Sequence, residues 1–100
     1  MHVTFVKKIL ENGELCPKCN DVSERLQSDG LIEFINHISI ADLRDKDSEG
    51  VRLAQKHEVA RAPFFLVKED DEEVVVFDVY FKFKKYIEGK NLIQAKTVSL

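Results

Sequence analysis

The chain has no tryptophan and only two cysteines, two prolines and four glycines among its 100 residues. It also lacks an excess of positive charge, because 15 Lys and Arg residues stand against 18 Asp and Glu residues, for a net charge of −3. A chain without a basic surplus has no electrostatic footprint for nucleic acid. No apolar run approaches the ~20 residues that span a bilayer, so we expect neither a nucleic-acid partner nor a membrane partner.

The first fifteen residues lack the long apolar stretch and the small-residue cleavage pattern of a signal peptide. We therefore expect a cytoplasmic location. A disulfide that only stabilises a fold does not persist there, and a close pair of cysteines in the cytoplasm is typical of catalysis or metal binding. One hundred residues are too few for two stable cores, so a single domain is expected.

What the chain does contain is one short motif that uses both cysteines, Cys16-Pro17-Lys18-Cys19. Two thiols at this spacing can close into a small disulfide and reopen, as the transfer of electron pairs between disulfides requires. Pro17 suits the first position of a helix, because its missing N–H would have no partner there. The motif therefore predicts a redox pair at the start of a helix.

Hydrophobic periodicity predicts alternating strands and helices along the chain. The expected strands lie within residues 3–9, 31–40, 64–67 and 74–77, and the expected helices within 17–30, 48–57 and 80–89. The acidic turn at 69–73 is short enough to predict an antiparallel hairpin. The resulting order, βαβαββα, indicates an α/β fold with a four-stranded mixed sheet flanked by helices.

Two residues mark expected helix ends: Gly30 as a left-handed cap of the first helix and Ser48 as the N-cap of the second. The second helix separates this order from the βαββαβ order of small copper chaperones, which also carry CxxC at the start of a first helix. Residues 1–89 are expected to form the domain, and residues 90–100 a C-terminal tail or a short extra element.

A strand, a CxxC that opens a helix, a second βα unit and a proline before a hairpin together resemble the thioredoxin-like fold. The stretch from Leu53 to Val67 is similar to the helix end, loop, proline and buried strand of thioredoxins and glutaredoxins. The resemblance covers residues 3–89 and implies a cis Ala62–Pro63 bond beside the cysteine pair. It also implies that the backbone of Ala62 pairs with an incoming peptide.

The chain departs from both subfamilies at several positions. Leu15 precedes Cys16 where typical thioredoxins have tryptophan, and the strand before the motif lacks their buried aspartate. The loop before Cys16 is a few residues longer than usual. The glycine pair of glutaredoxins is missing from residues 77–81, so the resemblance does not extend to glutathione binding.

The position of each cysteine predicts its role. The helix N-terminus and the cation of Lys18 are expected to lower the pKa of Cys16, whose leading position should keep it exposed. Cys19, one turn further, should face the core. We expect Cys16 to attack the substrate disulfide and Cys19 to release the product, with Pro17 stiffening the turn between them.

Other charged and imidazole side chains receive no catalytic role. Lys7 and Lys8 lie on an alternating strand and are expected to be solvated. A closed zinc site usually takes four protein ligands, and none of the three histidines shows ligand spacing with the cysteines. We assign no metal ligand within the monomer, while a site shared across a dimer stays open.

Together these features predict a thiol–disulfide oxidoreductase that reduces protein disulfides through Cys16 and Cys19. It would work as a monomer without a cofactor, and a disulfide reductase or another dithiol donor would supply its electrons. The alternative is a redox-inactive thioredoxin-fold module that binds proteins through the loop at Pro63. A metal carrier is a third hypothesis.

Overall fold

The computed structural model describes the backbone of residues 1–99 and the side chains of residues 1–90. Its elements are β1 (His2–Ile9), α1 (Pro17–Ser28), the 3-10 turn η1 (Ile32–Phe34), β2 (His37–Asp42), α2 (Glu49–Lys56), β3 (Phe64–Lys68), β4 (Val75–Phe77) and α3 (Tyr80–Ser99). The four strands form one sheet in the order β2-β1-β3-β4. β1 and β2 are parallel, whereas β3 runs antiparallel to both β1 and β4. The described residues thus confirm an α/β fold with a four-stranded mixed sheet and three helices.

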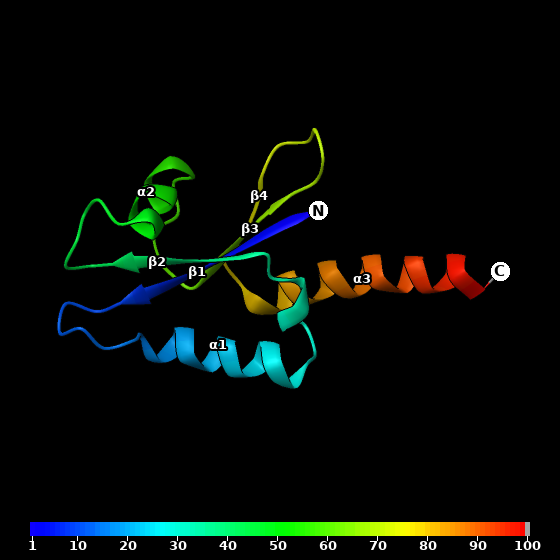
Figure 1. Cartoon of the computed structure of the whole chain (residues 1–100), viewed down its shortest axis with the longest axis horizontal. Helices are drawn as coiled ribbons and strands as arrows, with labels where there is room; N and C mark the ends of the chain where they lie inside the picture. Colours follow the sequence, from blue (N-terminus) through cyan, green and yellow to red (C-terminus); the bar gives the residue numbers. More distant parts are fainter. Residues whose placement is uncertain (100) are drawn as a thin grey trace.

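The sheet separates two layers of helices, with α1 on one side of the strands and α2 on the other (Figure 1). Side chains of β1 alternate between the two faces, as the pleat requires. The face that packs against α1 and α3 buries Val3, Phe5, Leu26, Leu31, Phe65, Val67, Phe83 and Ile87. The face that packs against α2 buries Val6, Ala41, Phe64 and Leu66. The central strand β1 therefore contributes to both cores.

Three stacked phenylalanine rings join the sheet to α3. Phe65 lies between Phe5, at a ring-centroid distance of 4.8 Å, and Phe83, at 3.9 Å. Phe5 and Phe65 are cross-strand partners, and Phe83 belongs to the first turn of α3. Each of these buried side chains stabilises the fold by roughly 1.5–3 kcal/mol relative to an exposed one.

The end of α1 is formed as its sequence predicted. Gly30 has φ +71°, and the N–H of Leu31 donates to the carbonyl of Leu26 at 2.8 Å. This left-handed residue satisfies the last carbonyls of the helix. The Tyr80 hydroxyl donates to the carboxylate of Asp29 at 2.7 Å, which links the end of α1 to the start of α3.

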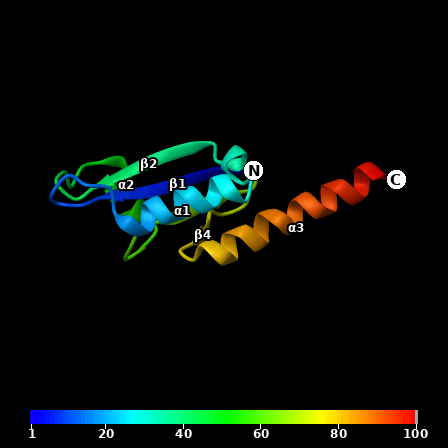
Figure 2. The same ribbon diagram turned by 90° about the horizontal axis from the view of Figure 1, so that it is seen from below.

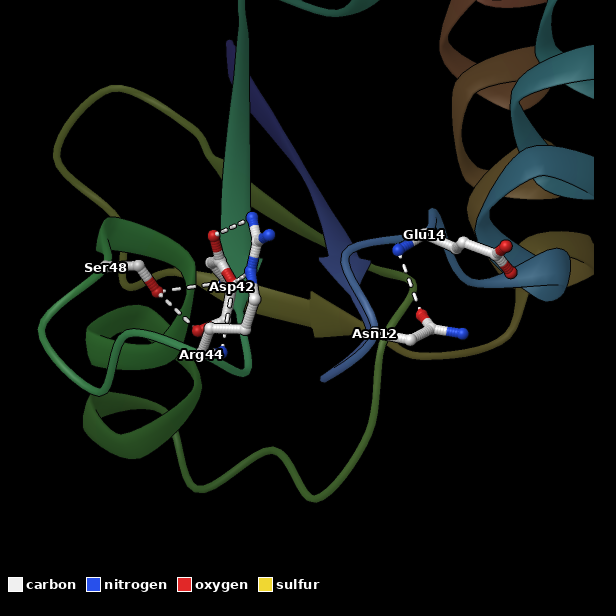
Figure 3. Close-up of polar contacts among 5 residues, drawn as sticks. All are labelled: Asn12, Glu14, Asp42, Arg44 and Ser48. Atoms are coloured by element: carbon white, nitrogen blue, oxygen red, sulfur yellow. Dashed lines mark hydrogen bonds and ion pairs between the residues drawn. The ribbon is translucent and has the colours of Figure 1, made fainter.

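The β1–α1 loop is a tight turn that folds back along the strand. Gly13 has φ +86°, a left-handed conformation that glycine adopts at little cost. The N–H of Gly13 donates to the carbonyl of Leu10 at 2.9 Å. The side chain of Asn12 accepts the N–H of Glu14 at 3.0 Å (Figure 3).

The second strand, expected in the later half of residues 31–40, is β2; it follows a 3-10 turn at residues 32–34 and continues two residues further than expected, to Asp42. Asp42 then turns the chain by pairing with Arg44 at 2.9 Å (Figure 3). Ser48 occupies the N-cap of α2, but its side chain makes no cap hydrogen bond. Its hydroxyl instead accepts the N–H of Asp42 at 3.0 Å. This hydrogen bond links the end of β2 to the start of α2.

Helix α3 continues past Gly89 and reaches Ser99. Residues 90–99, expected as a tail or a short extra element, therefore extend α3, while residue 100 lies outside the described residues. The later turns of α3 project beyond the sheet in both views (Figures 1 and 2). Within the described residues, no helix combines the length and the apolar character that crossing a membrane requires.

Gly50, in the first turn of α2, allows this helix to approach β2 closely. A Cβ at Gly50 would lie 2.3 Å from the backbone nitrogen of Ala41, too close for any side chain. We expect Gly50→Ala to lower the free energy of unfolding by about 1–3 kcal/mol in urea denaturation. Gly89→Ala is the matched control, because a Cβ there meets nothing within 4 Å. That variant should gain about 0.5–1 kcal/mol of stability, and equal effects at the two glycines would contradict the close approach.

Candidate functional site

The CPKC motif lies where α1 begins. Pro17 is the first residue of the helix, Cys16 is its N-cap, and the carbonyl of Cys16 accepts the N–H of Asn20 at 3.1 Å. Proline at the first helical position loses no hydrogen bond, which explains why the helix starts here. The predicted location of the two cysteines in the first turn is confirmed.

The peptide groups of Lys8 hold both cysteines against β1. The N–H of Cys16 donates to the carbonyl of Lys8 at 3.0 Å. The N–H of Lys8 donates to the Sγ of Cys19 at 3.2 Å. Both cysteines are free thiols and lie 4.1 Å apart. One residue of the strand therefore fixes the position of the N-cap and of the second thiol.

Cys16 is less accessible than the sequence predicted. Only 6% of its surface is exposed, and Cys19 is fully buried. The cause is the loop before Cys16, in which the N–H of Leu10 donates to the carbonyl of Glu14 at 2.8 Å and Leu15 forms a bridge with Ile9. This turn leads the chain back along β1, so Cys16 arrives packed against the end of the strand.

The surroundings of Cys16 favour its thiolate in spite of this burial. Burial by itself raises the pKa of Cys16. The N–H groups of Cys19 and Lys18 and the positive charge of Lys8 outweigh burial, and the resulting pKa lies below that of an ordinary cysteine. Donors and cations lower a thiol pKa because they stabilise the negative charge of the sulfur.

Cys19 has the opposite shift. Its burial raises the pKa of the thiol, and the N–H donated by Lys8 offsets only part of this effect. A negative charge on Cys16 raises the pKa of Cys19 further, since two like charges at short distance oppose each other. The pKa values of the two thiols are thus shifted in opposite directions, downward for Cys16 and upward for Cys19.

The positive charge of Lys8, which the sequence had predicted to be solvated, acts to lower the pKa of both cysteines. Lys18, expected to supply this charge, lowers the pKa of Cys16 through its backbone N–H. Both lysines are half-buried: Lys7 extends over the ring of Phe5 at 5.6 Å, and Lys8 lines a hollow on the α2 side. The alternation of the strand was the available signal, because it sends these two lysines to opposite faces of the sheet.

The segment before β3 lies beside the cysteine turn. The Ala62–Pro63 bond is cis, as the sequence resemblance implied. Pro63 and Lys18 line a surface hollow of about 300 Å³, so the loop and the CPKC turn share one surface. Ala62 and Lys8 line a second, mainly apolar hollow of about 500 Å³ on the α2 side.

The described residues contain no cluster of three or more His, Cys, Asp or Glu side chains arranged to hold a metal ion. The site therefore offers two thiols, one nearby ammonium group and several backbone donors. This set of groups is suited to exchange between a dithiol and a disulfide.

We expect Lys8→Gln to raise the pKa of Cys16, because the variant removes the nearby cation but keeps the backbone groups that hold the cysteines. The measurement is the pH dependence of Cys16 alkylation by iodoacetamide, followed on the peptide by mass spectrometry. Lys7→Gln is the matched control and should leave the pH profile unchanged. Equal shifts in the two variants would contradict a specific effect of Lys8.

No protein-family model, curated protein or solved structure matches this chain. The chemistry of the site follows from its own geometry: two thiols of opposite pKa shift, held by the backbone N–H and carbonyl of one residue of β1.

Proposed function

We propose that the protein is a thiol–disulfide oxidoreductase that reduces protein disulfides through Cys16 and Cys19. The observation that carries this proposal is the pair of free thiols, 4.1 Å apart, whose pKa values shift in opposite directions. Opposite pKa shifts suit a two-step exchange. The first thiol must attack as a thiolate, and the second must stay unreactive until the mixed disulfide has formed.

The exchange proceeds with balanced electrons and protons. The Cys16 thiolate attacks one sulfur of the substrate disulfide, a mixed disulfide forms, and the other substrate sulfur leaves as a thiolate that takes up a proton. Cys19 then loses its proton, attacks the Sγ of Cys16 and releases the second substrate thiol. The substrate gains two electrons, and the CPKC pair becomes a disulfide.

The arrangement of the chain supports membership of the thioredoxin-like superfamily. Its α/β architecture, with a four-stranded mixed sheet and three helices, is compatible with that fold. The cysteine turn opens α1, and the cis-proline segment precedes β3, beside Lys18 of the same turn. On this proposal the backbone of Ala62 pairs with an extended substrate peptide.

The low exposure of Cys16 bears on the substrate. Because Cys16 is only 6% exposed, we infer that a substrate disulfide approaches it from the surface shared by Lys18 and Pro63 or after the β1–α1 loop opens. An extended or partly unfolded peptide meets this requirement better than a disulfide inside a folded core. A dithiol donor or a disulfide reductase regenerates the pair, and no cofactor is required. The proposal assigns the protein to the cytoplasm, as a monomer.

The same burial favours a second candidate, a redox-inactive module of the same fold that binds proteins through the loop at Pro63. Here the cysteines would pack as small apolar residues. The two candidates differ in whether the thiols turn over, and this can be measured directly.

We expect the protein to accelerate the reduction of insulin disulfides by a chemical dithiol beyond the rate of the dithiol alone. Cys16→Ser should abolish the acceleration, because serine supplies no thiolate. Cys19→Ser should accumulate a mixed disulfide between Cys16 and the substrate, visible as an added mass, because the resolving thiol is missing.

Wild-type protein that gives no acceleration and does not differ from Cys16→Ser would overturn the oxidoreductase proposal and support the binding module. Ser23→Ala serves as a control for altered helix packing, since its hydroxyl only bonds the carbonyl of Cys19 at 2.9 Å. It should retain both thiols and the acceleration.

A further inference from the structure

The spacing and surroundings of the two thiols also suit a ligand that is not a disulfide. Cys16 and Cys19 lie 4.1 Å apart at the start of α1, where the N–H of Lys8 donates to the Sγ of Cys19 at 3.2 Å. A metal–sulfur bond is about 2.3 Å long, so two such bonds to one ion span at most about 4.6 Å. The 4.1 Å separation of the two cysteines is therefore short enough for one ion to be bound by both sulfurs.

The number of available ligands restricts which ion fits. Zinc takes three or four protein ligands, and the described residues bring no third His, Cys, Asp or Glu to the pair. Hard cations such as Mg²⁺ and Ca²⁺ require oxygen ligands. Among the metals that thiolates select, Cu(I) is the soft monovalent ion that two thiolates satisfy.

The charges around the pair complement such an ion. Two thiolates and Cu(I) together carry one negative charge, and the ammonium group of Lys8 is the cation that acts on both cysteines. The N–H of Lys8, 3.2 Å from the Sγ of Cys19, orients that sulfur as outer-shell donors orient metal ligands. Burial of both cysteines strengthens the attraction between thiolate and cation and limits the access of water.

We propose that the reduced Cys16–Cys19 pair binds one Cu(I) ion within a single chain, through its two thiolate sulfurs. Binding releases the protons of the two thiols, forms two Cu–S bonds and leaves the oxidation state of copper unchanged. The disulfide form has no thiolate to offer, so copper and disulfide exchange compete for the same sulfurs. The binding itself needs no turnover and does not rest on the reductase activity.

The test is an anaerobic titration of the reduced full chain with Cu(I), in competition with the chromophoric chelator bathocuproine disulfonate. We expect one copper per chain, ultraviolet absorbance from thiolate-to-copper charge transfer, and a complex with the mass of one chain. Wild-type protein oxidised to the disulfide should bind none. This form is the control that needs no substitution.

Variants locate the site. Cys16→Ser and Cys19→Ser should each lose the tight binding and the charge-transfer absorbance. Lys8→Gln should weaken the affinity by about 10-fold, as expected for loss of an outer-shell group, and Lys7→Gln should leave it unchanged.

Three outcomes would overturn the proposal: copper bound equally well by the disulfide form, one copper shared by two chains, or displacement of Cu(I) by an equal concentration of zinc. Because insulin reduction is measured separately, a protein that binds copper but reduces no disulfide would refute only the reductase proposal. The reverse result would refute only the copper site.

Discussion

The site depends on where the hydrogen bonding between β1 and β3 stops. β3 begins at Phe64, opposite Val6, because the preceding Pro63 has no N–H to continue a ladder. Lys8, two residues beyond Val6, therefore has no partner in β3. Its carbonyl and N–H are bonded instead by the N–H of Cys16 and the sulfur of Cys19. The cysteine turn thus takes the place of β3 beside the end of β1. Backbone hydrogen bonds of Lys8 therefore position both cysteines.

Apolar packing on both faces of the sheet holds this end of β1 in place. Phe5 and Val6 are neighbours in β1 but belong to different cores, one under α1 and α3 and one under α2. Their packing fixes the strand along its length, so Lys8 at its end has little freedom. The reactive turn therefore rests on a rigid element, which is the condition for well-defined thiol geometry.

Local sequence patterns were sufficient to predict the ends of α1 and the four-stranded mixed sheet. Pro17 marked the start of α1, Gly30 its end, and the four-stranded mixed sheet followed from the order of the elements. What the sequence could not give depends on contacts between distant segments. The burial of Cys16 arises from the way the loop from Leu10 folds back on β1, and the hydroxyl of Ser48 is used by a residue of another element.

Lys8 illustrates the same limit. Strand alternation places Lys7 and Lys8 on opposite faces of the sheet, but only the packing of the cysteine turn shows which lysine acts on the cysteines. The extent of α3 beyond Gly89 has a related cause, because an exposed glycine inside a helix is a local cost that the rest of the helix can offset.

The way Lys8 holds the cysteines separates two properties that most redox sites combine. The geometry of the turn comes from the peptide groups of residue 8, which every residue except proline provides, and the electrostatic bias comes from its side chain. Any substitution at this position that keeps the backbone can therefore change how strongly the thiolate is favoured while the scaffold stays intact.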